Sequence, residues 1–400
     1  MERNYPKIII SNEGEKWLDK GQMWMYKNNA LEINENIENG SLVDIVTTNN
    51  RYMGTGFLSK KSHITVRILS KNPKEIINRY FFKKRIQFAY DFRKTLEKDN
   101  MTNCRLVFGE ADQLPGLTVD RYNDILVCQI SSYGLEECKD MIYKLLLEVC
   151  EDDGVHISGI YERNDIQVRA KEGLPLEKGF YKGVDIPTVT TIDENGLKLN
   201  VDVENGQKTG YFLDQKANRV LLRNMSYNKK VLDCFSHTGG FALNAAYGRA
   251  KKVVAVDVSK TALNQAYENA KLNRLEQNIS FVQDDVFEYL DKCKTGEFDI
   301  IVLDPPAFTK SRKTINRAYN GYKRINMRAM ELLKNGGYLI TCSCSRFMET
   351  DNFEKMLREA ASEANVTLKQ VSVTQQNHDH PILWTMEETS YLKFYIFQII

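Results

Sequence analysis

Apolar segments between residues 231 and 345 end in side chains that could bind a nucleoside or react with a base. These ends carry Asp233 with the loop 234–240, Asp257, Asp304 and Cys344. In an open parallel sheet, ligands bind beyond the carboxyl ends of the strands. The pattern therefore predicts one crevice in which the glycine loop, the carboxylates and the thiol converge.

The types of residue at these ends suit an adenosine-type cofactor. Glycines in a loop after a buried strand let the backbone approach a ligand closely. Asp257 follows Asp233 near the roughly 20-residue interval at which an acid meets ribose hydroxyls. A carboxylate after the segment 279–282 can accept from an adenine amino group. The residues expected to line this cofactor site are Asp233, Phe235, Thr238, Gly239, Gly240, Asp257, Asp284, Asp285 and Asp304.

The loop 236–240 argues against a dinucleotide. It lacks the G-x-G-x-x-G turn with which a helix N-terminus receives a pyrophosphate. S-adenosylmethionine has no phosphate and needs carboxylates for its ribose, so it fits better. The alternative is that these aspartates only end strands and cap helices, which is a common role of Asp. His237 could be a loop donor or a capping residue.

The sequence Asp304-Pro305-Pro306 predicts a rigid exit from the sheet, because two prolines can neither donate to a ladder nor continue a strand. Its carboxylate and backbone carbonyls would then face the crevice, and Phe308 could stack on a base. Methyltransferases that act on planar amino groups or bases have a similar motif, although here Ala307 separates the prolines from the aromatic ring. A plain turn is the alternative.

Cys344 lies toward the carboxyl edge of the last of these strands and is the candidate nucleophile. Cys234, Cys293 and Cys342 are better interpreted as small buried hydrophobes. A thiolate that adds to C6 of cytosine makes C5 nucleophilic, so C5 can take a methyl group before its proton leaves and the thiol is expelled. The thiol pKa of about 8.5 must be lowered for this chemistry to run efficiently.

The remaining chain predicts two further domains ahead of an alternating βαβ pattern. Length alone suggests two or three domains in 400 residues. Short strands at 8–10, 42–46, 52–57 and 64–69 indicate a small barrel or sandwich. A helix at 74–97, strands at 104–108, 117–120, 125–130, 159–162 and 166–169, and a helix at 135–150 indicate an α+β unit. We expect an α/β protein with domains at 1–70, 71–190 and 191–400.

Composition excludes several classes. The net charge is +2, so any affinity for nucleic acid must come from local patches. No apolar run approaches the ~18 residues of a membrane span, and the N-terminal apolar triplet is too short for a signal peptide. The dispersed cysteines lack CxxC spacing and favour reduced thiols over disulfides or a metal site. We expect a soluble, cytoplasmic protein that contacts no membrane and binds no metal.

A basic stretch directly follows the Asp-Pro-Pro sequence and is the candidate RNA-binding segment. It spans residues 309–328, contains no acid, and includes tyrosines that could stack on unpaired bases. Basic side chains there could contact phosphates, although charge runs are more often solvated helix faces. The residues expected to contact RNA are Lys310, Arg312, Arg317, Tyr322, Lys323 and Arg324.

Six motifs together resemble the PUA-domain family of S-adenosylmethionine-dependent methyltransferases that modify cytosine C5 in 23S ribosomal RNA. The motifs are residues 108–122, 208–215 and 234–240, Asp304-Pro305-Pro306, Ser343-Cys344-Ser345 and Asp379-His380-Pro381. The resemblance covers essentially the whole chain. It implies an N-terminal PUA barrel, a central α+β domain and a C-terminal Rossmann-like class I methyltransferase domain.

The resemblance also implies roles for individual residues. Asp257, Asp285 and Asp304 would line the cofactor site with the glycine loop, Gln215 and Arg219 would lie close to it, and Cys344 would be the nucleophile. Many RNA cytosine-C5 methyltransferases have a second cysteine after the Asp-Pro-Pro motif that helps to release the product. Ala307 stands there in this chain, and the base that removes the C5 proton stays unassigned.

Two other functions are alternatives. The same fold could methylate a base nitrogen or a guanine without a covalent step, with Asp304 orienting the acceptor. The chain could also be a non-enzymatic RNA-binding assembly factor. The sequence leaves open which nucleotide is modified, whether the substrate is naked RNA or a ribosomal particle, and whether the protein is a homodimer.

Overall fold

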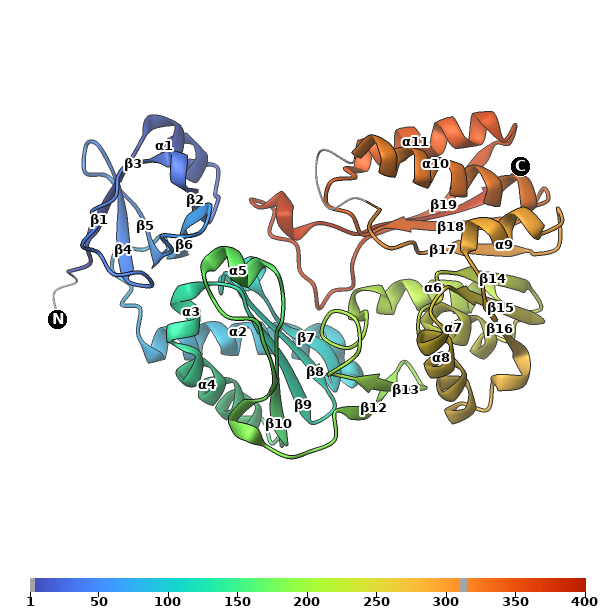
Figure 1. Cartoon of the computed structure of the whole chain (residues 1–400), viewed down its shortest axis with the longest axis horizontal. Coiled ribbons are helices and arrows are strands. Elements are labelled where there is room, and N and C mark those ends of the chain that lie inside the picture. The colour runs from blue at the N-terminus through green and yellow to red at the C-terminus, as the bar shows by residue number, and fades with distance from the viewer. Residues whose placement is uncertain (1–3, 309–314) are drawn as a thin grey trace. The chain divides into compact units, whose positions relative to one another are not determined.

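The computed structural model describes residues 4–308 and 315–400 (Figure 1). Contacts between residues divide the chain into two compact units. Unit 1 comprises Met1–Ile192, Val201–Leu213 and His378–Thr389, and unit 2 comprises Asp193–Asn200, Asp214–Asn377 and Ser390–Ile400. The three-domain division at residues 70 and 190 stays a prediction.

The first part of unit 1 is a six-stranded sheet in the order β2-β6-β5-β4-β1-β3, in which only β1 and β4 pair in parallel. The predicted strands are confirmed; β2, β3 and helix α1 were missed because they are short. The strands and the helix are β1 (Lys7–Ile10), α1 (Asn12–Asp19), β2 (Trp24–Tyr26), β3 (Ala30–Glu32), β4 (Leu42–Thr47), β5 (Tyr52–Leu58) and β6 (Ile64–Ser70). Ile8, Ile45 and Val66 are buried in its core.

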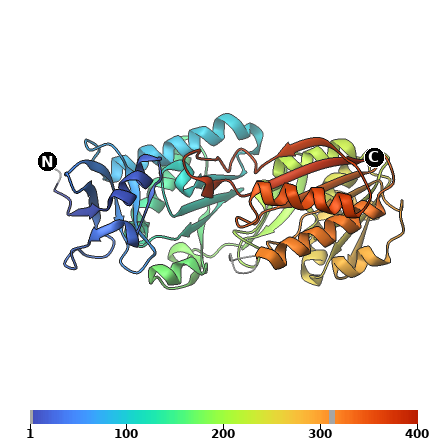
Figure 2. The same cartoon turned by 90° about the horizontal axis from the view of Figure 1, so that it is seen from above.

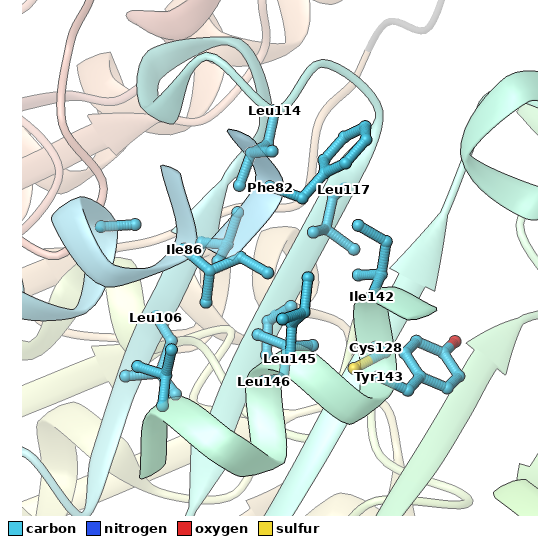
Figure 3. Close-up of a cluster of buried hydrophobic side chains, with 14 of the residues drawn as sticks. Phe82, Ile86, Leu106, Leu114, Leu117, Cys128, Ile142, Tyr143, Leu145 and Leu146 are labelled. Carbon is cyan, nitrogen blue, oxygen red and sulfur yellow. The ribbon is translucent and has the colours of Figure 1, made fainter. Parts of the chain in front are cut away.

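The second part of unit 1 is a five-stranded sheet in the order β11-β10-β9-β8-β7. Two helices pack on it and bury a core drawn from both helices and from four of the strands; part of this core is drawn in Figure 3. These elements are α2 (Arg79–Glu97), β7 (Asn103–Phe108), β8 (Leu117–Tyr122), β9 (Ile125–Ile130), α3 (Tyr133–Glu137), α4 (Lys139–Asp152), β10 (Gly159–Asn164), α5 (Val168–Glu172) and β11 (Glu177–Phe180). The predicted α+β character is confirmed.

The predicted strand at 166–169 is wrong, because residues 168–172 form helix α5. The Arg169 side chain is buried, donates to the Ile130 carbonyl and pairs with Glu136. Gly173 ends the helix at φ +77°, in the left-handed region that glycine adopts without strain. The sequence pattern of a short strand was therefore overridden by a buried charged contact.

Unit 2 contains a seven-stranded sheet in the order β16-β15-β14-β17-β18-β20-β19, parallel from β14 to β18. Strands β19 and β20 are antiparallel at one edge and were not predicted. The strands are β14 (Lys230–Cys234), β15 (Lys252–Asp257), β16 (Ile279–Gln283), β17 (Ile300–Leu303), β18 (Tyr338–Ser343), β19 (Leu368–Thr374) and β20 (Lys393–Ile399). This arrangement confirms the predicted Rossmann-like α/β domain.

Helices cover both faces of this sheet (Figure 1). One group contains α6, α7 and α8, and the other contains α9, α10 and α11; both views show α10 and α11 side by side (Figure 2). The helices are α6 (Lys216–Met225), α7 (Gly240–Tyr247), α8 (Lys260–Leu272), α9 (Val286–Lys292), α10 (Ile315–Leu332) and α11 (Thr350–Glu363). None of the helices in the described part of the chain combines the length and apolarity that a membrane crossing requires.

The chain passes between the units more than once. The hairpin of β12 (Val189–Glu194) and β13 (Leu197–Asp202) has residues in both. The segment 378–389 lies between β19 and β20 in sequence but belongs to unit 1. Within that unit, Arg93 Nη2 donates to the Asp379 carbonyl at 2.9 Å, and Asp379 Oδ2 accepts from the Arg105 backbone N–H at 2.9 Å. Asp379, of the Asp379-His380-Pro381 motif, thus holds this segment against the five-stranded sheet of unit 1.

Candidate active site

Three carboxylates of unit 2 converge at the carboxyl ends of neighbouring parallel strands. Asp233 lies on β14, Asp257 ends β15, and Asp304 directly follows β17. Burial raises the pKa of Asp233 well above its usual range, and the nearby carboxylates of Asp304 and Asp257 raise it further. The three carboxyl groups therefore lie close enough to act on one another, and the raised pKa favours a protonated, uncharged Asp233.

Asp233 organises the loop that follows it. Its Oδ2 accepts from the Ala242 backbone N–H at 2.8 Å, which ties β14 to the first turn of α7. Its Oδ1 is buried and has no hydrogen-bond partner among the described residues. The side chain is fully buried, so its main contribution in this structure is the hydrogen bond that joins β14 to the start of α7.

The loop between β14 and α7 is held in an unusual backbone conformation. Phe235 and His237 have φ values of 61° and 49°, a region that costs energy for residues other than glycine. Gly239 has φ 84°, and a Cβ there would lie 3.0 Å from the Ala266 Cβ of α8. Glycine at position 239 is thus required by the backbone and by helix packing within the protein. Strain of this kind concentrates at functional sites.

Asp257 fastens this loop to the next strand. Its Oδ2 accepts from the His237 backbone N–H at 2.9 Å, and its Oδ1 accepts from the Ser259 N–H at 2.8 Å. His237 therefore contributes its backbone N–H as a loop donor, and burial lowers the pKa of its ring. Each carboxylate oxygen has a second lone pair, so Asp257 can still accept from ribose hydroxyls.

Asp284 and Asp285 have local structural partners. Asp285 caps α9, with its Oδ1 accepting from the N–H groups of Phe287 and Glu288. Asp284 pairs with Lys292 at 2.7 Å. The alternative that these aspartates cap helices is therefore correct for Asp285 Oδ1. Both capping bonds use Oδ1, so the role of Oδ2 toward an adenine amino group stays a proposal.

Asp304 is oriented by two side chains from other elements. Its Oδ1 accepts from the Cys342 thiol at 2.9 Å and from Gln215 Nε2 at 3.3 Å. Burial raises the pKa of Cys342 well above its usual range, so this thiol stays protonated and acts as a donor. Cys234 and Cys342 are buried as predicted, whereas Cys293 is only partly buried. The Asp-Pro-Pro sequence thus places a fixed carboxylate beside Gln215.

Arg219 lies near the loop but has a partner within unit 2. Its Nε and Nη2 donate to the two carboxylate oxygens of Glu194 at 2.7 and 2.6 Å, and both side chains are buried. It also acts electrostatically on His237 and Asp233. Its guanidinium therefore supports the loop region while its charge is balanced by Glu194. Glu194 was not found from the sequence, because the pair needs the β12 turn to meet α6.

Phe308, two residues after the Asp-Pro-Pro sequence, belongs to an aromatic cluster. The ring of Phe308 is 6.4 Å from that of Phe235, 6.2 Å from that of Phe287 and 4.6 Å from that of Tyr322. Tyr322 is 0 % exposed, and its hydroxyl accepts from Ser343 Oγ at 3.1 Å. The prediction that Tyr322 stacks on RNA is therefore wrong for this structure, because its ring is a core residue of α10.

The other predicted RNA contacts have different surroundings. Lys310 and Arg312 lie outside the described residues. Arg317 is exposed on α10. Lys323 pairs with Glu363 at 2.6 Å and Glu359 at 3.5 Å, and Arg324 lies 3.5 Å from Asp291. Part of the positive charge of α10 is therefore compensated within unit 2.

Cys344 directly follows β18, at the carboxyl ends of the parallel strands where Asp257 and Asp304 also lie, and it is partly buried. On the neighbouring strand β20, Lys393 is paired in register with Ser343 and is buried. Sequence reasoning missed Lys393, because it lies next to the carboxyl end of β18 only through the antiparallel pairing of β20 with β18. The described residues contain no cluster of three or more His, Cys, Asp or Glu side chains that could hold a metal ion.

Comparisons with known proteins agree with this geometry. Residues 179–396 match the S-adenosylmethionine-dependent methyltransferase model, and residues 8–71 match a PUA-like domain. The chain is 38% identical over 97% of its length to ribosomal RNA large subunit methyltransferase I of Klebsiella pneumoniae, covering 97% of that protein. The corresponding Escherichia coli O157:H7 protein is also 38% identical, with 97% of this chain and 98% of that protein covered.

Solved structures are similar over the whole chain. A Streptococcus mutans protein assigned as an S-adenosylmethionine-dependent methyltransferase is 25% identical, with a TM-score of 0.82 and coverage of 98% of this chain and 100% of that one. A methyltransferase in complex with S-adenosylhomocysteine gives a TM-score of 0.84 at 25% identity, with the same coverage.

Proposed function

The chain belongs to the ribosomal RNA large subunit methyltransferase I family, and from that membership we propose that it methylates C5 of a cytosine in large-subunit ribosomal RNA. The observation that carries the proposal is Cys344, which follows β18 at the sheet edge where Asp257 ends β15 and Asp304 follows β17. A thiol beside a methyl-donor site suits a carbon acceptor that needs covalent activation.

The chain is an S-adenosylmethionine-dependent methyltransferase, and the site residues fit this cofactor. The carboxylates of Asp257 and Asp304 give a negative site for its positively charged sulfonium. Asp257 would accept from the ribose hydroxyls, and Asp285 would accept from the adenine amino group. Gln215 and the loop 235–240 would complete the binding surface. When bound, the cofactor supplies an electrophilic methyl group.

The proposed reaction uses one covalent bond to the protein. Cys344 Sγ, as the thiolate, adds to C6 of the cytosine and makes C5 a nucleophile. C5 then takes the methyl group. A base removes the C5 proton, the electrons of that bond restore the C5–C6 double bond, and the Sγ–C6 bond breaks to return the thiolate. Asp304, held by Gln215 and Cys342, would orient the acceptor base.

Methylation of a base nitrogen or a guanine is the alternative within the same fold. It needs Asp304 to orient the acceptor and needs no covalent step. The assembly-factor alternative has less support, because the chain belongs to a family of methyltransferases. Mass spectrometric mapping of ribosomal RNA from cells that lack the protein tests the substrate. We expect one 5-methylcytidine of the large subunit to disappear; loss of a methylated guanine or of a nitrogen methyl group instead would contradict the proposal.

Removing the Asp257 carboxylate should weaken cofactor binding. Asp257→Asn should lower the affinity for S-adenosylmethionine by roughly 10- to 100-fold, because a hydrogen bond to a charged group contributes about 1.5–3 kcal/mol. Isothermal titration calorimetry measures this directly. Glu268→Gln on α8 is the matched control, since that exposed carboxylate pairs only with Lys271 among the described residues. Equal affinities in both variants would remove Asp257 from the cofactor site.

Reversing exposed charges on α10 should weaken RNA binding alone. Arg317 and Arg324 are the better choices, because two glutamates hold Lys323. Arg317→Glu with Arg324→Glu should reduce affinity for a ribosomal RNA fragment and make it less dependent on salt, since each lost phosphate contact lowers the salt slope by about one. Filter binding at several salt concentrations measures both. Loss of S-adenosylmethionine binding to the same extent would instead indicate a damaged fold.

A further inference from the structure

Lys393 has a buried ammonium group beside Cys344. Strand β20 runs antiparallel to β18, with Ser343 opposite Lys393 and Cys342 opposite Phe394. The Lys393 Nζ donates to the carbonyl oxygens of Ser345 and Tyr391, both at 2.8 Å. Ser345 is the residue after Cys344, so the hydrogen bond fixes the ammonium at the backbone that directly follows the candidate nucleophile.

A lysine in this position is unusual. Lys393 is 8 % exposed, and lysine is almost never buried without a partner of opposite charge. In the part of the chain that the structure describes, no carboxylate makes an ion pair with it. The ionisable groups that act on Lys393 are Cys344 first, then Cys342, and then Glu349. The two thiols therefore act on its charge more strongly than Glu349, the one carboxylate in this set.

Cys342 is not a counter-ion for Lys393. It is fully buried, and its thiol donates to Asp304 Oδ1 at 2.9 Å. Burial and the Asp304 carboxylate both raise the pKa of Cys342. A thiol that donates to a carboxylate stays protonated, which leaves Cys344 as the group that can carry the negative charge.

We propose that the Lys393 ammonium is a positioning group that keeps Cys344 in its thiolate form. The proposal rests on the proposed function only in taking Cys344 as the nucleophile. An ammonium that is attracted to a thiolate also stabilises that thiolate, because the interaction is mutual. Lys393 thus acts through Cys344 and needs no contact with the RNA.

The other groups around the pair are compatible with this role. Tyr322 of α10 also interacts with Cys344, and burial raises the pKa of its phenol, so it stays neutral. Glu349, the residue before α11, acts on Lys393 more weakly than the two thiols, and the exposed Arg346 lies two residues after Cys344. Burial lowers the pKa of Lys393 to about 8. At pH 7 the lysine is therefore still mostly charged, and thiolate activation should fade above about pH 8.

The test measures the ionisation of Cys344 without turnover. The full chain is alkylated with iodoacetamide between pH 5 and 10, and the rate at Cys344 is followed by peptide mass spectrometry. Lys393→Gln removes the charge but keeps N–H donors for the two carbonyls, and Lys393→Arg keeps the charge. Lys369→Gln, at an exposed position of β19, is the matched control.

The expected outcome separates charge from structure. In the wild type and in Lys369→Gln, Cys344 should titrate below the ordinary thiol pKa of about 8.5. Lys393→Gln should raise that midpoint and slow alkylation at pH 7 about tenfold for each unit of change, whereas Lys393→Arg should stay close to the wild type. An unchanged midpoint in Lys393→Gln would overturn the proposal.

The wild-type titration decides the matter even where the glutamine variant does not fold, because a Cys344 midpoint at or above about 8.5 overturns the proposal by itself. Failure of the proposed function gives a different result. A lowered Cys344 midpoint that depends on Lys393, in a protein that methylates a nitrogen, would contradict the C5 reaction and leave the Lys393 inference standing.

Discussion

Replacing Cys344 with alanine should abolish methyl transfer to ribosomal RNA while S-adenosylmethionine still binds. A covalent nucleophile that is removed leaves only positioning and binding, and comparable losses in other enzymes are on the order of 10⁴-fold or more. The side chain is small and lies beyond the end of β18, so the sheet should not be disturbed. Single-turnover assays with tritiated S-adenosylmethionine measure the methyl transfer, and calorimetry measures the binding.

The neighbouring thiol provides the matched comparison for that variant. Cys342→Ala removes a donor to Asp304 but no proposed nucleophile, so it should reduce the rate far less than Cys344→Ala. Substantial turnover by Cys344→Ala would favour methylation of a nitrogen without a covalent step.

Replacing Arg219 with methionine should destabilise unit 2 by about 3–5 kcal/mol, because it leaves the Glu194 carboxylate buried without its partner. Both side chains of the pair are almost completely buried, and the contact is bidentate. The loss should appear as a lower urea midpoint, followed by circular dichroism.

A second substitution at the partner distinguishes the ion pair from simple loss of packing. In the double variant Arg219→Met with Glu194→Leu, no charge is left buried, so much of the stability should return. A double variant as unstable as the single one would show that the arginine acts through its packing alone.

The parts of the site that could be predicted are those that depend on parallel strand order. Asp233 and Asp257 lie near or at the carboxyl end of an apolar strand, and Asp304 and Cys344 directly follow one. The alternating βαβ pattern places such strand ends on one side of the sheet. The sheet of unit 2 confirms that pattern from β14 to β18. The glycine loop was predicted as well. Glycine at position 239 is already required by close packing against Ala266, without any ligand.

The residues that could not be predicted depend on contacts between segments distant in sequence. Lys393 reaches Cys344 only because β20 inserts antiparallel beside β18, and Glu194 meets Arg219 from a separate hairpin. Tyr322 was assigned to RNA from its basic neighbours, but it shares a buried helix face with Ala318, Ile325 and Ala329. That helical spacing was visible in the sequence and could have placed Tyr322 in the core.

The covalent step through Cys344 is tested most directly with RNA that contains 5-fluorocytidine. Fluorine at C5 cannot leave as a proton does, so the Sγ–C6 bond cannot be released after methyl transfer. With S-adenosylmethionine present, the wild-type protein should form an RNA adduct that survives denaturing electrophoresis and maps to Cys344, and Cys344→Ala should form none. An adduct of equal yield in Cys344→Ala, or no adduct with a wild-type protein that methylates the unmodified RNA, would contradict the account.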